Sequence, residues 1–170
     1  MADDRLYFAY GSNINLDQMS YRCPDACVVG PVSLENYELL FRRGGFATIA
    51  PCEGGKVHGL LWSLTPECER SLDMYEGYPR FSDKRTVTVR DGLGRELSVM
   101  AYIMDERFRE PMLPSTIYYN GILEGYRQNG LPVTALKKAW DHAVREVSQE
   151  TERINATASR SPRRRNDHER

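Results

Sequence analysis

The segment Leu6-Tyr7-Phe8-Ala9-Tyr10-Gly11-Ser12-Asn13 joins a short, aromatic and apolar run to a turn. Such a run, ended by turn residues, predicts a buried strand over 6–10. Gly11 lets the backbone turn sharply and lets a ligand approach closely, and Asn15 can cap a short helix after the turn. The turn is therefore either an ordinary strand-to-helix connection or a cradle whose N–H groups bind an anion or a carboxylate.

The rest of the chain predicts an α+β protein. Short apolar or alternating runs between turn residues predict strands at 27–30, 37–41, 47–50, 57–64, 84–90 and 97–104, and helices are predicted over 65–75, 114–127 and 134–152. The strands mostly follow one another without regular helices between them, which disfavours a doubly wound parallel sheet. A small curled or closed barrel with helices on its outside would protect the many short edge strands.

Composition indicates one globular domain and excludes several classes of protein. Hydrophobic residues make up 41% of the 170-residue chain and charged residues 28%, which is typical of globular proteins. Lys and Arg number 23 against 24 Asp and Glu, so binding to nucleic acid is not expected. We assign residues 1–158 to the domain and the arginine-rich segment 159–170 to a disordered tail. No apolar run approaches the roughly 20 residues of a membrane span, and the first residues do not resemble a signal peptide, so we expect a cytoplasmic protein that does not bind membranes.

The cysteines and histidines predict neither a disulfide framework nor a metal site. Cys23, Cys27, Cys52 and Cys68 are too few for a disulfide scaffold, and we expect reduced thiols packed as small hydrophobic side chains. None of the three histidines pairs with another at metal-ligand spacing. No haem, zinc or nucleotide motif is present either, so we expect neither a metal nor a cofactor.

One carboxylate is placed for acid–base chemistry. Glu76 falls at the C-terminal end of the helix predicted over 65–75, just before Gly77. The negative end of the helix dipole and desolvation by Tyr75 and Tyr78 would both raise its pKa, which suits a general base near neutral pH. The alternative is a surface glutamate at a frayed helix end, and for Asp73 we expect a solvated role. Without an activated nucleophile, such a site fits a reaction in which the substrate brings its own nucleophile.

The chain also resembles the gamma-glutamylcyclotransferase family, called AIG2-like, from Leu6 to about Ser148. The similar segments are Y-F-A-Y-G-S-N at 7–13, M-S-Y-R-C-P-D-A at 19–26, G-F-A-T-I at 45–49, V-H-G-L-L-W at 57–62, L-D-M-Y-E-G at 72–77, P-S-T-I-Y at 114–118 and N-G-L-P at 129–132. Each segment alone is weakly specific, whereas the whole set in this order is specific. Ser12 and Asn13 resemble the general branch more than the glutathione-specific or gamma-glutamylamine branches.

The resemblance implies a small mixed β-barrel with flanking helices and a cofactor-independent enzyme of the acyltransferase or cyclising lyase type. Its reaction would convert a gamma-glutamyl amino acid or amine to 5-oxoproline and the free amino acid or amine, by attack of the α-amine on the γ-carbonyl. Glu76 would be the catalytic acid/base. The implied substrate-binding residues are Tyr7, Tyr10, Gly11, Ser12, Asn13 and Tyr118. Tyr119 is the adjacent tyrosine that a shift of one residue in the helix register would place at the ligand instead. Segments 78–83 and 105–114 are expected to contact the departing group, whose identity, like the oligomeric state, the resemblance does not assign.

Two alternatives to the enzyme stay open on the sequence. The first is a non-catalytic small-molecule-binding or regulatory relative that keeps the barrel, although the presence of Glu76 argues against it. The second is an interaction protein whose arginine-rich tail binds an acidic partner, which predicts salt-sensitive association that is lost when 159–170 is removed.

Overall fold

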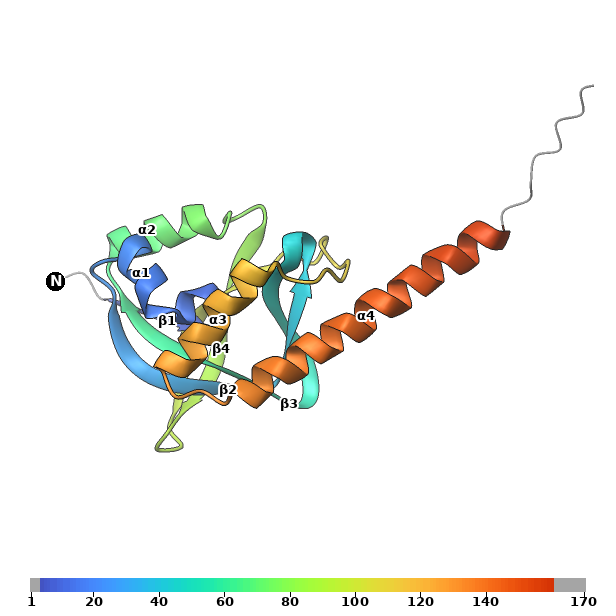
Figure 1. The fold of residues 1–170 in the computed structure, drawn as a ribbon. Coiled ribbons are helices and arrows are strands. Elements are labelled where there is room, and N and C mark those ends of the chain that lie inside the picture. The colour runs from blue at the N-terminus through green and yellow to red at the C-terminus, as the bar shows by residue number, and fades with distance from the viewer. Residues whose placement is uncertain (1–3, 161–170) are drawn as a thin grey trace, which may run out of the picture.

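Among residues 4–160, which the computed structural model describes, five strands close into a barrel in the order β1-β3-β2-β4-β5 (Figure 1). The strands are β1 Arg5–Ala9, β2 Cys27–Arg42, β3 Phe46–Leu64, β4 Ser82–Asp91 and β5 Glu96–Met104; the helices are α1 Leu16–Arg22, α2 Pro66–Tyr75, α3 Thr116–Gln128 and α4 Val133–Arg160, with short 3-10 turns η1 Ser12–Ile14 and η2 Arg43–Gly45. β1 pairs parallel with β5, and the other neighbours are antiparallel. The predicted α+β fold, a small mixed barrel with flanking helices, is confirmed.

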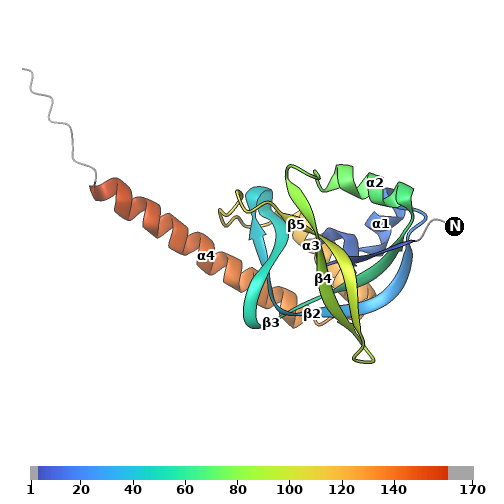
Figure 2. The same ribbon diagram turned by 180° about the vertical axis from the view of Figure 1, so that it is seen from behind.

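The long hairpin of β2 and β3 is the largest departure from the predicted strands (Figure 2). The sequence predicts two short segments for each strand, and this prediction is wrong because each strand is continuous. Shifts of register between Val28 and Gly30 and between Glu35 and Tyr37 mark irregularities in β2. A bulge bends a strand without ending it. Residue types that are typical of turns therefore curve this hairpin around the barrel instead of breaking it.

The predicted cap of α2 is confirmed and fixes the position of Glu76. Thr65 Oγ1 accepts a hydrogen bond from the N–H of Cys68 at 3.2 Å, which satisfies one of the free donors of the first turn. Pro66 occupies the first helical position, where its fixed φ suits the helix. The last turn closes with a bond from the N–H of Glu76 to Leu72 O at 2.8 Å. Glu76 therefore sits immediately beyond the end of α2.

The turn after β1 is fastened to α3. Asn15 Oδ1 caps α1 by accepting from the N–H of Gln18 at 3.0 Å, and Asn15 Nδ2 donates to Gly121 O at 2.9 Å. From the end of α3, Asn129 Nδ2 donates to Ile14 O at 3.0 Å. The last two bonds join residues more than 100 positions apart in the sequence. They fasten η1 and the start of α1 to α3.

The barrel interior leaves no space for a side chain at one glycine of β3. A Cβ at Gly59 would collide with the carbonyl oxygen of Ala9 and with the ring of Phe8, both on the neighbouring strand β1. Phe8 is completely buried, so its ring has little room to move.

We therefore expect Gly59→Ala to lower the free energy of unfolding by about 1–3 kcal/mol, the usual cost of overpacking. Chemical denaturation measures the change. The matched control is Gly92→Ala in the β4–β5 turn, where nothing lies within 4 Å of an added Cβ. Equal stability of the two variants would contradict the close contact between β3 and β1.

α4 is longer than predicted and only partly covers the barrel. It continues beyond Glu152 to Arg160 and so includes the first two residues of the predicted tail, whereas 161–170 lie outside the described residues. Leu136 and Ala143 are buried against the body. Figures 1 and 2 show the C-terminal part of the helix projecting away from the barrel. No helix within 4–160 is both long enough and apolar enough to cross a membrane.

The four cysteines are free thiols, but they do not all pack as small hydrophobic side chains. Cys23 and Cys68 are buried side by side, with Cys23 Sγ 3.4 Å from Cys68 O. Cys27 is exposed, and Cys52 is partly exposed. The predicted packing therefore holds for the first pair and is wrong for Cys27.

Candidate functional site

A cavity of about 290 Å³ is lined by residues from β1, η1, the start of β3, the end of α2, the start of β4, β5 and α3. The structure brings together on its walls all seven residues that the sequence singled out: Tyr7, Tyr10, Gly11, Ser12, Asn13, Glu76 and Tyr118. Several phenols, one amide and one carboxyl group thus face a single space. This composition suits a small polar ligand that needs one acid–base group.

Asn13 occupies the centre of the polar part of the cavity. Its Oδ1 accepts from Arg22 Nη1 at 2.8 Å, and its Nδ2 donates to Tyr7 OH at 3.0 Å and lies 3.4 Å from Glu76 Oε1. Its backbone oxygen accepts from Trp62 Nε1 at 3.0 Å. Because a guanidinium can only donate, Arg22 fixes which way the amide points. The amide N–H groups are therefore held toward the phenol and the carboxyl group.

Glu76 has a pKa raised to about 7, chiefly because burial disfavours the ionised form. Arg22 opposes this shift and lowers the pKa. The predicted rise in the pKa of Glu76 is thus present, but the expected position of Tyr78 beside it is wrong. Tyr75 lines the cavity, whereas Tyr78 does not and instead places its ring 4.4 Å from Lys84 Nζ. A carboxyl group with this pKa can both accept and return a proton near pH 7.

Asp73 anchors α2 to the barrel, so the expectation of a solvated role is wrong. It accepts from Lys84 Nζ at 2.8 Å and from Tyr102 OH at 2.5 Å. Lys84 also contacts Glu69 Oε1 at 3.3 Å, and the side chains of these three charged residues are at most one-quarter exposed. The network ties α2, which ends just before Glu76, to β4 and β5. The network thereby positions the Glu76 carboxyl group without contacting it.

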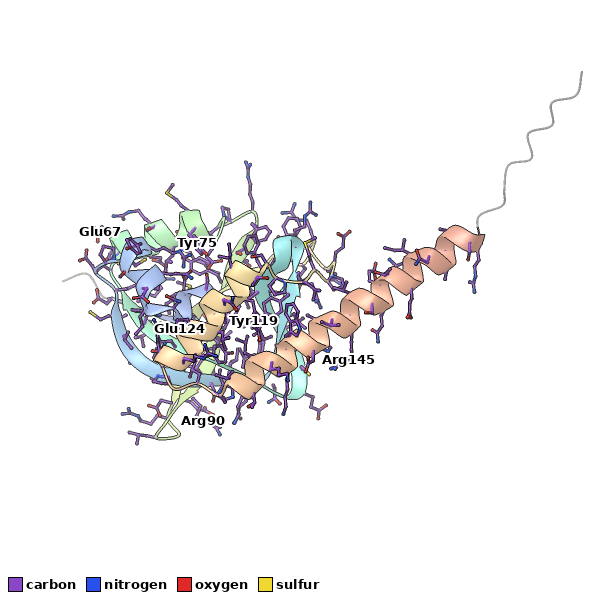
Figure 3. All side chains as sticks on the ribbon, in the orientation of Figure 1. Glu67, Tyr75, Arg90, Tyr119, Glu124 and Arg145 are labelled. Atoms are coloured by element: carbon purple, nitrogen blue, oxygen red, sulfur yellow. The ribbon has the colours of Figure 1, made fainter. Side chains whose placement is uncertain are left out.

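Arg22, to which the sequence analysis gave no role, forms a second support together with Tyr75. The Arg22 guanidinium lies 3.8 Å from the centre of the Tyr75 ring, and its Nη2 donates to Gln18 Oε1 at 2.9 Å. Tyr75 OH is 2.9 Å from Ser12 Oγ, and either can be the donor. Figure 3 shows Tyr75 at the end of α2. Arg22 belongs to a segment that resembles the family, but no local pattern shows its contact with Asn13.

Tyr118, and not Tyr119, faces the cavity. Tyr118 OH accepts from the N–H of Ala47 at 3.1 Å. A Cβ at Gly11 would lie 3.3 Å from that hydroxyl oxygen and 3.3 Å from the Ala47 side chain, so the turn passes close to both. Tyr119 points to the other side of α3, where its ring packs 5.2 Å from Trp140 of α4 (Figure 3). The register of the helix therefore agrees with the assignment of Tyr118.

The phenols of Tyr7 and Tyr10 stay protonated near neutral pH. Burial, as the largest cause, and the nearby Glu76 both raise the pKa of Tyr7 and of Tyr10 well above its usual value. The Tyr10 hydroxyl donates to the carbonyl oxygen of Tyr102. Tyr7 OH accepts from Asn13, which leaves its own proton available. Tyr7 and Tyr10 are hydrogen-bonding groups here, and neither of them is a base.

The two segments expected near the departing group differ in their position. Phe81 and Ser82, within 78–83, line the cavity. None of 105–114 lines it, although the Phe108 ring packs 5.2 Å from the Phe81 ring and supports it from behind. Tyr102, a further wall residue, was not singled out by the sequence.

Comparison with known proteins gives a consistent result. A family model described as "Gamma-glutamyl cyclotransferase, AIG2-like" matches residues 7–120. The gamma-glutamylcyclotransferase of Bos taurus is 33% identical over 144 residues, covering 78% of this chain and 76% of its own, and that of Homo sapiens is 31% identical with the same coverage. A solved structure named gamma-glutamyl cyclotransferase aligns with a TM-score of 0.73 at 30% identity, over 81% of this chain and 86% of that one.

Proposed function

This chain belongs to the gamma-glutamyl cyclotransferase, AIG2-like family, and on that premise we propose that it converts a gamma-glutamyl amino acid or amine to 5-oxoproline and the free amino acid or amine. The observation that carries the proposal is Glu76, a carboxyl group with a pKa of about 7 beside the amide of Asn13 in a cavity of suitable size. Neither the geometry nor the comparisons favour a non-catalytic binding protein.

In the proposed complex, the gamma-glutamyl group occupies the polar part of the cavity. The first N–H groups of η1 have no partner within the turn and can bind the α-carboxylate. The α-amine then lies near Glu76, and the γ-carbonyl oxygen near the hydroxyl of Tyr7 and the amide of Asn13. Holding the amine against the carbonyl within one molecule supplies much of the rate, because the reacting atoms are already close.

Glu76 relays protons from the attacking nitrogen to the departing nitrogen. The ionised carboxylate takes a proton from the α-ammonium group, and the free amine forms a bond to the γ-carbon. Tyr7 and Asn13 donate hydrogen bonds to the oxygen as it becomes negative. Protonated Glu76 then gives its proton to the departing nitrogen as the amide bond breaks. The regenerated carboxylate passes the second proton of the ring nitrogen to the departing amine, which leaves as an ammonium ion. No water is consumed, and Glu76 returns to its starting state.

The proposal is tested by incubating the full chain with gamma-glutamyl amino acids, glutathione and gamma-glutamyl amines. Liquid chromatography quantifies 5-oxoproline and the released amine, which the proposal expects in equal amounts. Release of glutamate instead of 5-oxoproline would show hydrolysis by water and contradict the cyclisation. No product from any of these substrates would contradict the activity itself.

The rate is expected to depend on pH through Glu76. Only the ionised carboxylate accepts a proton, so kcat/KM should rise with pH and level off above an apparent pKa near 7. An initial-rate profile from pH 5 to 9 measures this, with circular dichroism at each pH as the control for folding. A midpoint near 4.5, the ordinary value for glutamate, would contradict the role of the buried carboxyl group.

A small gamma-glutamyl compound is the partner in this proposal, and the cytoplasm is the proposed location. The low cysteine content supports the location, because secreted domains of this size that depend on disulfides have many more.

A further inference from the structure

The cavity has a polar interior and an apolar mouth. The interior residues are almost fully buried, with exposed fractions of 3% for Tyr7 and 2% for Asn13. At the mouth, Phe46 is 45% exposed and Met74 is 85% exposed. Exposed apolar side chains around a cavity mark a surface that a ligand or partner covers. We call Phe46, Met74 and Phe81 the apolar mouth.

The rings of the apolar mouth are held in place before any ligand binds. Phe46 and Phe81 lie edge to face with centres 6.0 Å apart, and Phe46 meets Tyr118 in the same way at 5.3 Å. Phe108 supports Phe81 from behind, with ring centres 5.2 Å apart. A further aromatic ring can extend this edge-to-face arrangement. The surface is thus preformed for an apolar or aromatic group.

Cationic side chains are absent from the cavity walls within residues 4–160. Arg22 is engaged by Asn13 and Gln18, and Lys84 by Asp73 and Glu69. A carboxylate on the departing group would therefore find no opposite charge on the cavity walls that the described residues form. The peptide carboxylate of a departing dipeptide gains nothing here, whereas an apolar side chain gains contact.

We propose that the departing group is an apolar, preferably aromatic, amino acid or amine whose side chain packs against the apolar mouth. This inference rests on the proposed cyclotransferase activity and assigns its substrate class. The gamma-glutamyl group fills the polar interior, so the amide nitrogen points outward and places its substituent between Phe46 and Met74. In the reaction the α-nitrogen bonds to the γ-carbon, the γ-carbon–nitrogen bond breaks, and the aromatic amine leaves with the proton from Glu76.

The test compares kcat/KM for gamma-glutamylphenylalanine, gamma-glutamylglycine, gamma-glutamylphenethylamine and glutathione, with 5-oxoproline as the readout. An apolar subsite that gains several methylene equivalents should favour phenylalanine over glycine by about tenfold or more. Gamma-glutamylphenethylamine, whose departing amine lacks the carboxylate, should have a kcat/KM within about threefold of that of gamma-glutamylphenylalanine. Within residues 4–160, no cation on the cavity walls stabilises the charge that it lacks.

Two variants test whether the apolar mouth causes the preference for phenylalanine over glycine. Phe46→Ala and Met74→Ala should each reduce the phenylalanine-to-glycine ratio severalfold, and Met74 is so exposed that its replacement leaves folding unaffected. The control is Leu93→Ala, a 79% exposed apolar residue in the β4–β5 turn outside the cavity, which should leave the ratio unchanged.

The outcomes separate this inference from the proposed function. A high ratio that falls in the mouth variants supports it. Three results would overturn the substrate class but leave the cyclotransferase activity standing. They are a phenylalanine-to-glycine ratio near or below one, a preference for glutathione, and a ratio that is unchanged in both mouth variants. No 5-oxoproline from any of the four compounds overturns the activity, and the substrate class with it.

Discussion

Replacement of Glu76 with glutamine is expected to lower kcat for 5-oxoproline formation by about 10³-fold or more. One side chain both removes the proton from the nucleophile and protonates the departing nitrogen, and loss of a general acid or base costs about 10²–10⁴-fold. Glutamine has nearly the same shape and keeps an oxygen in reach of Asn13 Nδ2, 3.4 Å away in the native protein. KM should therefore change far less than kcat, which separates loss of chemistry from loss of binding.

The matched control for this variant is Glu67→Gln. Glu67 lies in the first turn of the same helix, its side chain is 73% exposed, and it forms an ion pair with the exposed Arg70. Its replacement should leave kcat within about twofold. A Glu76→Gln enzyme that keeps more than one-tenth of the native rate would rule out Glu76 as the acid/base.

A stability measurement on the same variant shows whether the fold is intact. The pKa of Glu76 is raised in the folded state, so between pH 4.5 and about 7 the folded chain holds a proton that the unfolded chain has lost. The contribution of Glu76 to the free energy of unfolding is therefore fully present below pH 4.5 and is lost as pH rises through about 7. Glutamine does not titrate. The variant should gain stability relative to the native protein over this interval, and a constant difference would contradict the pKa shift.

The features that could be predicted from the sequence are those that neighbouring residues determine. Thr65 and Pro66 mark the start of α2 because a cap and a fixed φ act within one turn. The predicted position of Glu76 at the helix end therefore agrees with the structure. The alternation in 84–90 and 97–104 likewise predicted the β4–β5 hairpin, since the turn and both strands are local.

The features that could not be predicted depend on contacts across the chain. Gly30 and Asn36 are typical turn residues, yet in β2 they accompany bulges, because the partner strand β3 continues the pairing past them. The link from Asp73 to Lys84 and the link from Asn13 to Arg22 are hydrogen bonds between separate elements. No local pattern encodes such a partner. The sequence could therefore name groups that line the cavity, but it could not name those that hold them in place.

Arg22 is the support whose removal should affect the reaction most. Arg22→Met removes a charged hydrogen bond to Asn13 Oδ1, and such bonds contribute about 1.5–3 kcal/mol. The amide can then rotate away from Tyr7, so kcat/KM should fall about 10- to 100-fold. Since the Arg22 charge lowers the pKa of Glu76, its loss should also move the acid limb of the pH profile to higher pH.

Arg22→Lys separates the two effects, because it keeps the charge but not the planar group that bonds Asn13 and Gln18 together and stacks on Tyr75. Its acid limb should stay near the native position while its rate falls. Arg70→Met, a charge removal on the exposed side of α2, serves as the control and should change neither quantity. Rate loss in Arg22→Met with an unmoved acid limb would mean that Arg22 only shapes the turn. An upward shift, absent in Arg22→Lys and in the control, would show that the charge of Arg22 sets the protonation of the catalytic carboxyl group through space while its geometry orients Asn13.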